Sequence, residues 1–133
     1  MIIIIAGGRN FENYKLLKFK CDKILKNINE EIIIISGHAP GADSLGEKYA
    51  KEKGYKLKIY EADWDNINVP NAIIKTNKYG NLYNANAGFD RNLKMALNAD
   101  ALICFWDGIS PGSKNMIDIA NDKKLLVRII KYV

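Results

Sequence analysis

The chain carries several polar side chains directly after an apolar segment in its last third. Residues 101–105 are apolar or small and too few for a helix, and two turn-forming pairs, Asp-Gly and Pro-Gly, then break the run. This pattern predicts a buried strand, a tight loop and a helix beginning near Pro111, which together point backbone N–H groups at an anion. The side chains of Asp107, Ser110 and Ser113 would select what the anion is attached to. The alternative is a plain β-α turn whose glycines only relieve strain.

Arginine is scarce in this chain, and its placement is informative. Among 20 basic residues only Arg9, Arg91 and Arg128 are arginines, and the first two lie in glycine-bearing segments. A planar guanidinium can make two parallel hydrogen bonds to a phosphate or carboxylate, which an ammonium group cannot. Arg9 and Arg91 are therefore candidates for such a contact. For Arg91 a structural ion pair with Asp90 or Asp107 is the alternative.

Carboxylates and backbone amides complete the candidate site. Asp43 or Asp107 would accept hydrogen bonds from ribose hydroxyls or hold a divalent cation, although Asp43 also suits the cap of a helix. The amides that would donate to a phosphate are those of Gly8, Gly41, Gly112 and Ser113.

The sequence allows more than one role for each of two side chains, Trp106 and His38. Trp106 would either stack on a base or pack in the core. His38 is interpreted as a loop residue rather than as an acid or base.

The elements that must position these residues follow a β-α rhythm. Apolar runs predict five strands, at residues 2–6, 32–36, 55–60, 101–105 and 125–130. Apolar residues at helical spacing predict four helices, over residues 14–28, 42–53 and 88–98 and from residue 111 onward. The third of these is expected to turn Leu93, Ala96 and Leu97 inward.

This succession predicts an α/β fold of three layers. The fold class is Rossmann-like, with a parallel five-stranded sheet in the order 3-2-1-4-5 and right-handed crossovers. The third strand alternates lysines with apolar residues, which is typical of a defended sheet edge. The crevice for a ligand then lies between the loops at residues 7–10 and 106–113, with the loop at 37–43 beside it.

Residues 61–87 do not fit this rhythm. They show no sustained period and are too many for an ordinary connection. Trp64, Tyr79 and Tyr83 favour a lid or a contact in a homo-oligomer over disorder.

Composition limits the class of protein. With 133 residues, 48% hydrophobic and 26% charged, the chain fits one globular domain over residues 1–133. No apolar run approaches the roughly 20 residues of a membrane span, and the first strand lacks a basic leader and a cleavage site. We therefore expect a cytoplasmic protein with no membrane partner.

The net charge, the cysteines and the single histidine give weaker evidence of function. The formal net charge of +5 would suit nucleic acid, but the lysines are spread over what we interpret as solvent faces. Cys21, Cys104 and the single histidine lack the spacing of a metal site, so neither a metal site nor another cofactor is predicted.

Five segments in chain order resemble motifs of one family. They are residues 7–11 for G-S-R-x-F, 37–43 for G-G-A-x-G-A-D, 62–64 for A-D-W, 87–95 for A-G-x-x-R-N-x-x-M, and 99–112 for A-D-A-L-I-x-F-W-D-G-x-S-x-G. On these motifs the chain resembles the YspA/YpsA-related branch of the SLOG superfamily, the Rossmann-like group that includes SMF/DprA and LOG proteins. The resemblance covers essentially the whole chain.

The resemblance implies a domain that binds a nucleotide or a nucleotide-derived small molecule at the carboxyl ends of the strands, as a sensor or sequestering module. LOG enzymes cleave the N-glycosidic bond of nucleoside monophosphates with an Arg and a Glu. Alignment of this chain with their loop puts Met116 at the Glu position, which argues against that reaction here. The shorter relatives also lack an insertion at residues 69–86.

Two other functions remain as alternatives. One is a nucleotide hydrolase acting on a glycosidic or phosphate bond, with Asp43, Arg91 and Asp107 as candidate catalytic residues. The other is a single-stranded nucleic acid binder, as in the DprA branch. The predicted ligand-binding residues are Gly7, Gly8, Arg9, Gly37, Gly41, Asp43, Arg91, Asn92, Trp106, Asp107, Gly108, Ser110, Gly112 and Ser113.

Overall fold

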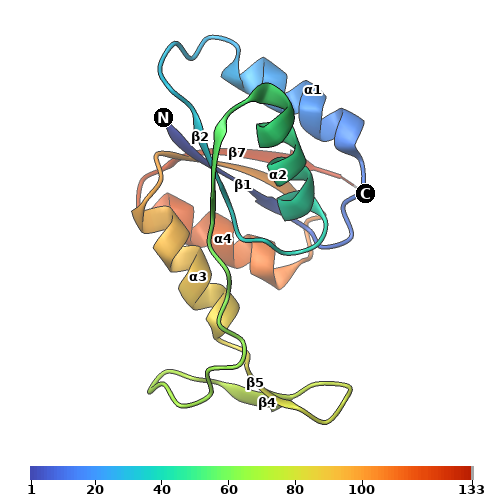
Figure 1. Cartoon of the computed structure of the whole chain (residues 1–133), viewed down its shortest axis with the longest axis vertical. Helices are drawn as coiled ribbons and strands as arrows, with labels where there is room; N and C mark the ends of the chain where they lie inside the picture. The colour runs from blue at the N-terminus through green and yellow to red at the C-terminus, as the bar shows by residue number, and fades with distance from the viewer. Residues whose placement is uncertain (133) are drawn as a thin grey trace.

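The computed structural model describes residues 1–132 and consists of one twisted parallel sheet between two pairs of helices, with a small hairpin beside it (Figure 1). The elements in chain order are β1 (Ile2–Gly7), α1 (Tyr14–Leu25), β2 (Ile33–Ser36), α2 (Ala42–Lys53), β3 (Lys56–Ile59), β4 (Ile74–Thr76), β5 (Leu82–Asn84), α3 (Ala87–Leu97), β6 (Ala101–Trp106), α4 (Pro111–Asp122) and β7 (Leu126–Lys131).

The main sheet has the strand order β3-β2-β1-β6-β7, and all its pairings are parallel. The predicted order 3-2-1-4-5 is therefore confirmed, with β6 and β7 as the fourth and fifth strands. β3 lies at the edge, as its lysines indicated. The central strand β1 begins with four isoleucines and contains no polar side chain, because both of its faces are covered by helices.

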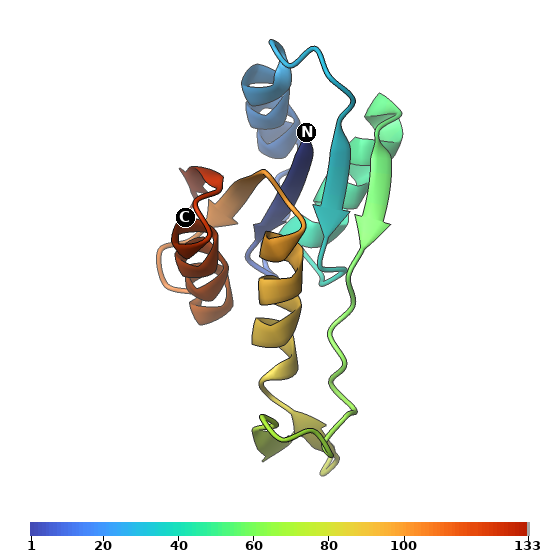
Figure 2. The same cartoon turned by 90° about the vertical axis from the view of Figure 1, so that its left-hand side faces the viewer.

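Alternating residues of the strands supply two separate cores. Ile3 and Ile5 of β1 pack with α1 and α2 on one face, and Ile4 and Ala6 pack with α3 and α4 on the other. Figure 2 shows the two helix pairs on opposite sides of the sheet. This arrangement is the three-layer sandwich expected from the β-α rhythm.

Local signals explain where the helices begin. The side chain of Asn13 accepts a hydrogen bond from the Leu16 amide at 3.1 Å and caps α1. Pro111 occupies the first turn of α4, as predicted, but Ser110 at the cap position makes no capping hydrogen bond with its side chain. Among the described residues, the first amides of this helix therefore remain free of side-chain acceptors.

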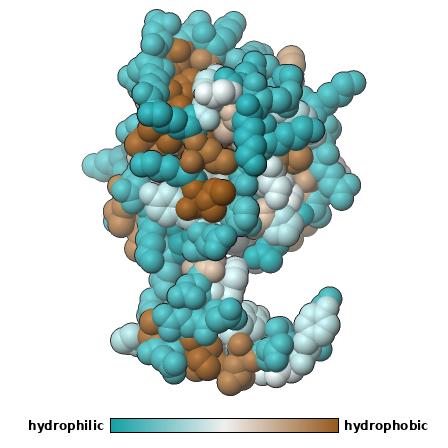
Figure 3. Space-filling view, viewed as in Figure 1, coloured by the Kyte–Doolittle hydropathy of each residue, from teal (hydrophilic) through white to brown (hydrophobic). Residues whose placement is uncertain are grey.

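Residues 61–87 contain a feature that the sequence pattern did not indicate. β4 and β5 pair antiparallel, with Ile74 opposite Asn84 and Thr76 opposite Leu82. Because each strand has three residues, the alternation of apolar and polar positions is too short to stand out. The hairpin projects beyond the carboxyl ends of the sheet strands, and Figure 3 shows hydrophobic side chains on its surface.

The face of α3 that points inward also differs from expectation. Ala96 is buried as predicted, but Leu93 is 38% exposed and Leu97 is 62% exposed. Asn92 and Met95 point inward instead. The helix has apolar residues on two stripes, and its packing against α4 selects the stripe that contains Met95.

Candidate functional site

A cavity of about 450 Å³ lies where the carboxyl ends of β1 and β6 meet the first turns of three helices. Its wall is formed by the loop after β1, the starts of α2, α3 and α4, and the loop between β6 and α4. This is the crevice predicted between the loops at residues 7–10 and 106–113. The predicted site residues that line it are Gly7, Gly8, Arg9, Asp43, Arg91, Asn92, Asp107, Ser110, Gly112 and Ser113.

A larger hollow of about 780 Å³ lies at the opposite end of the sheet, near the ends of α1 and α2. It is open, its lining mixes acidic and basic side chains, and no predicted site residue contributes to it. We place the candidate site in the smaller cavity, because ligands of open α/β sheets bind at the carboxyl ends of the strands where the strand order reverses.

Two arginines face the cavity without a carboxylate partner. The Nη1 atom of Arg91 donates to the carbonyl oxygen of Gly37 at 2.7 Å, and its Nε donates to Asn92 Oδ1 at 3.3 Å. The guanidinium carbon of Arg9 lies 5.7 Å from the centre of the Trp64 ring. Within residues 1–132, neither arginine is within 4.0 Å of a carboxylate oxygen. The alternative interpretation of Arg91, a structural ion pair with Asp90 or Asp107, is therefore wrong.

Asp43 is the acidic group buried beside these arginines. It is 5% exposed, and its Oδ2 accepts a hydrogen bond from the Ala39 amide at 3.2 Å. This bond closes the loop before α2 and does not cap the helix, whose cap residue is Gly41. Burial raises the pKa of Asp43 to about 6, although the Ala39 amide and the charge of Arg91 act in the opposite direction.

Asp107 has a different environment at the rim. Its Oδ1 accepts hydrogen bonds from the amides of Ile109 and Ser110, each at 2.8 Å. The donation from Ser110, followed by that from Ile109, lowers the pKa of Asp107. The carboxylate thus fixes the loop that precedes α4, in the manner of an Asx turn.

The two tryptophans lie differently from the sequence interpretation. The Trp106 indole donates from Nε1 to the Ser110 carbonyl oxygen at 3.0 Å, and the Lys131 ammonium lies 5.7 Å from the centre of its ring. Trp106 packs against the core and is not among the lining residues. Trp64 lines the cavity instead, and its ring sits so close to Gly88 that a Cβ there would lie 2.9 Å from it.

Trp64 and the apolar floor of the cavity were missed as site residues. The A-D-W motif at residues 62–64 was the signal for Trp64, but a loop gives no period from which a side-chain direction follows. Phe89, Met95 and Met116 complete the apolar part of the wall. Met116 belongs both to this wall and to the core between α4 and the sheet.

The remaining predicted glycines have separate positions. Gly37 lines an adjoining pocket of about 260 Å³, which shares Arg9, Trp64 and Arg91 with the main cavity. Gly41 has a φ of +81°, and a Cβ there would press on the backbone of Arg9. Gly108 has a φ of +86° and lies in the turn next to Lys131, outside both pockets.

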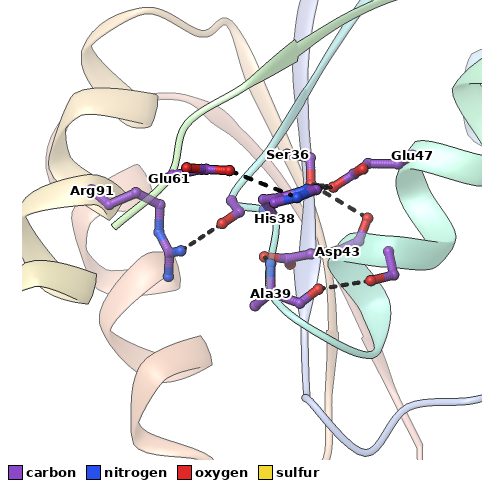
Figure 4. Close-up of polar contacts among 9 residues, drawn as sticks. Ser36, His38, Ala39, Asp43, Glu47, Glu61 and Arg91 are labelled. Atoms are coloured by element: carbon purple, nitrogen blue, oxygen red, sulfur yellow. Dashed lines mark hydrogen bonds and ion pairs between the residues drawn. The ribbon is translucent and has the colours of Figure 1, made fainter. Parts of the chain in front are cut away.

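The loop after β2 holds a polar network that reaches the adjoining pocket (Figure 4). The buried Ser36 hydroxyl donates to Glu47 Oε2 at 2.8 Å, and His38 Nδ1 lies 2.8 Å from the same oxygen. His38 Nε2 is 3.8 Å from Oε1 of Glu61. The hydrogen bond with Glu47 is the main cause of a raised pKa at His38.

Cys21 and Cys104 are free and buried, and burial raises the pKa of each thiol to about 12. Residues 1–132 contain no group of three or more His, Cys, Asp or Glu side chains placed to hold a metal ion. None of the helices described is long and apolar enough to cross a membrane.

Comparison with known proteins relates the first half of the chain to a family and the whole chain to a known fold. Residues 1–66 match the model of the YspA, cpYpsA-related SLOG family. No curated protein sequence matches the chain significantly. Among solved structures, DNA processing protein A (DprA) from Streptococcus pneumoniae is similar, with a TM-score of 0.67 and 19% identity.

That alignment covers 99% of this chain and 50% of the DprA chain, so the present chain spans about half the length of that protein. At this identity the likeness shows the fold, which is Rossmann-like in both. The family match carries the first two β-α units and the loop that holds Trp64. The first half of the chain, residues 1–66, therefore matches the YspA, cpYpsA-related SLOG family.

Proposed function

We propose that the chain binds a nucleotide or a nucleotide-derived small molecule in the 450 Å³ cavity, as a sensor or sequestering module. The family and the DprA-like fold support a nucleotide-related or nucleic-acid-related role in general. The observation that carries the finer proposal is the pair Arg9 and Arg91, which face one cavity without a carboxylate partner among residues 1–132. Asp43 supplies one negative charge near these two guanidinium groups, which leaves a positive charge that an anion from outside the chain can neutralise.

The first turn of α4 supports a phosphate at this place. Gly112 and Ser113 line the cavity, and no side chain of residues 1–132 caps the helix. The unsatisfied amides and the positive end of the helix dipole both favour a negative charge. A phosphate between this turn and the arginines would receive charge-assisted hydrogen bonds from both sides.

The rest of the wall suits a nucleoside. The ring of Trp64 and the side chains of Phe89 and Met95 offer apolar and aromatic surface for a base. Asp43 can accept from a ribose hydroxyl when it is ionised. Met116 supplies no carboxylate at the position where LOG enzymes have one, so glycosidic cleavage of the LOG type is not part of this proposal.

Calorimetry with Arg91→Lys tests the proposal. Wild-type protein is titrated with AMP, ADP, GMP and GDP, with and without Mg²⁺. We expect binding of at least one of them and a loss of about 1–3 kcal/mol in the variant, because lysine keeps the charge but loses the bidentate geometry. Arg128→Lys, a change at an exposed position on β7, is the matched control and should bind normally.

Thermal unfolding of the same variants separates binding from structure. Arg91 also donates to the Gly37 carbonyl, so a modest decrease in melting temperature is compatible with the proposal. Normal affinity together with a large decrease in melting temperature would instead make Arg91 a structural residue. If no nucleotide binds to the wild type, the proposed function is wrong.

The alternative ligand is single-stranded DNA. The similar Streptococcus structure is of a DNA processing protein, and the net charge of this chain is +5. However, the described cavity is lined by two arginines and no lysine, and an oligonucleotide needs a longer basic track. Tight binding of an oligonucleotide without binding of mononucleotides would favour this alternative.

A further inference from the structure

His38 occupies a backbone conformation that favours glycine. Its φ is +60°, in the left-handed region, where side chains other than those of Asn, Asp and His are rare. Such a conformation persists only where surrounding contacts hold it, and it often occurs at functional sites. The contact that holds the His38 side chain is the hydrogen bond of its Nδ1 with Glu47 Oε2.

Glu47 is itself buried and fixed. The residue is 8% exposed. Its Oε2 accepts hydrogen bonds from the Ser36 hydroxyl and from the imidazole of His38, each at 2.8 Å. Ser36 Oγ in turn accepts a hydrogen bond from the His38 amide at 3.0 Å. The ring and the backbone of His38 are therefore tied to the same two residues, so its orientation is set from both sides.

This arrangement determines the roles of the two ring nitrogens. An ionised carboxylate can only accept, so the hydrogen of the neutral imidazole lies on Nδ1 and Nε2 is left as the free base. A carboxylate behind a histidine in this way is the usual device for orienting a general base. Figure 4 shows the ring of His38 between Glu47 on one side and Glu61 on the other.

The free nitrogen lies at the pocket that adjoins the main cavity. His38, Arg9 and Arg91 all line this space of about 260 Å³. The distance of 3.8 Å between His38 Nε2 and Glu61 Oε1 exceeds a direct hydrogen bond, and a water beside the pair can bond to both. A water activated by His38 would thus meet a group held by the arginines at the junction of the two pockets.

We propose that the site hydrolyses a nucleoside diphosphate, with His38 as the general base and Glu47 as its positioning residue. This inference rests on the nucleotide binding of the proposed function, because it needs the nucleoside in the main cavity, and it replaces the role of sensor or sequestering module by turnover. The phosphate next to the ribose would then lie at Arg9 and Arg91, which line both pockets, and the terminal phosphate would enter the adjoining one.

In the reaction, the water oxygen forms a bond to the terminal phosphorus while Nε2 of His38 takes one of the water protons. The bond from that phosphorus to the bridging oxygen breaks, and the bridging oxygen leaves with the electron pair as part of a nucleoside monophosphate. The products are the monophosphate and orthophosphate, and the imidazolium returns its proton to solvent. Arg9 and Arg91 stabilise the charge that develops on the leaving oxygen.

The charged groups around His38 set its pKa and thereby the pH range in which it can act as a base. Glu47 of α2, then Glu61 after β3 and Asp43 of α2 raise the pKa of His38, and partial desolvation lowers it. Arg9 and Arg91 are the positively charged residues that line its pocket. Activity should therefore rise with pH as the imidazole loses its proton.

Phosphate release from ADP, GDP, UDP and CDP tests the inference, with product separation by chromatography and binding measured separately by calorimetry. The variants are His38→Asn, His38→Gly and Glu47→Gln. We expect His38→Asn and His38→Gly to lower kcat by roughly 10²- to 10⁴-fold, with a much smaller change in Kd. His38→Gly should melt at the wild-type temperature or above, because glycine adopts a φ of +60° freely.

Glu47→Gln supplies a readout that a purely structural role would not change. Removal of the carboxylate removes the main cause of the raised pKa of His38, so the acidic limb of the pH profile should move to lower pH. A profile that stays in place would contradict the role of Glu47.

Two results would overturn the role of His38. One is binding of nucleoside diphosphates by the wild type without phosphate release, and the other is equal release by wild type and His38→Gly. If the wild type binds no nucleotide, the proposed function itself fails, and this inference fails with it.

Discussion

Asp43 shows how burial changes the chemistry of a single carboxyl group. Its pKa is raised from 3.8 to about 6, so the folded state holds a proton in a range where the unfolded chain has released it. The contribution to stability is therefore fully present below about pH 4 and is lost as the pH rises to about 6. Above that pH, the buried charge lowers the free energy of unfolding.

Asp43→Asn should remove this pH dependence. The asparagine side-chain oxygen can still accept from the Ala39 amide, and no charge has to be buried. We expect the free energy of unfolding of the variant, relative to wild type, to increase by on the order of 2–3 kcal/mol between pH 4 and pH 7. Urea unfolding at several pH values measures it. A difference that stays constant with pH would show that Asp43 titrates normally.

In the first turn of α4, one substitution should affect stability and nucleotide binding in opposite directions. A Cβ at Gly112 would meet no atom within 4 Å, and its backbone does not need glycine. Gly112→Ala should therefore keep or raise stability, by up to about 1 kcal/mol from helix propensity. The added methyl group would enter the space of the proposed phosphate, so nucleotide affinity should fall.

Gly54→Ala is the matched control for that change. Gly54 ends α2 with a φ of +72°, far from the candidate site, and nothing lies within 4 Å of its Cβ position. Alanine there should lower stability by about 1 kcal/mol through backbone strain and leave binding unchanged. Urea unfolding and calorimetry on both variants test the contrast. Equal affinity of Gly112→Ala and wild type would count against a phosphate at α4.

The hairpin β4–β5 should be the least protected part of the regular structure. Its exposed apolar residues include Ile73, Ile74 and Leu82, and a hairpin of two short strands has little stability of its own. Its firm anchor is Asn84, whose amide donates to the Trp64 carbonyl at 2.6 Å. Hydrogen exchange measured by mass spectrometry should therefore be fast over residues 74–82 and slow in β1, β2 and β6. Slow exchange in the hairpin would mean that another surface covers it.

These elements also show what sequence patterns can predict. β1, β2 and β6 were located because a strand covered on both faces must be apolar throughout, and the helices followed from their stripes. The exposure of Leu93 and Leu97 could not be predicted, since α3 carries two apolar stripes and only the position of α4 selects between them. The three-residue strands of the hairpin were missed because they are shorter than any reliable period.

Prediction of the site was limited because the strand order places the loops but not the side chains on them. Loops such as 7–10 and 106–113 could be placed together because their strands were known to be neighbours. Side-chain directions in loops could not be derived. The sequence therefore predicted Trp106 as a ligand-binding residue, whereas Trp64 lines the cavity. The contact of His38 with Glu47 joins a loop to a helix across nine positions, and no short motif encodes it.

At the scale of the whole molecule, the charge of +5 predicts how binding responds to salt. A nucleotide held by two arginines should lose little affinity when salt is raised, because few counterions are released. An oligonucleotide that neutralises 6–10 phosphates would lose about 10³- to 10⁵-fold between about 50 and 200 mM salt. Calorimetry with ADP and fluorescence polarisation with a labelled oligonucleotide distinguish the two. A steep salt dependence for ADP would show that lysines outside the cavity take part.

The position of Trp64 gives the protein an optical property. The chain has two tryptophans, and only Trp64 lines the cavity, with the Arg9 guanidinium carbon 5.7 Å from its ring centre. A ligand that draws Arg9 toward itself, or stacks on the indole, changes the emission of this residue. Trp106, hydrogen-bonded to the backbone of its own loop, supplies a constant background. The native protein can thus report occupancy of its cavity by its own fluorescence, without any attached dye.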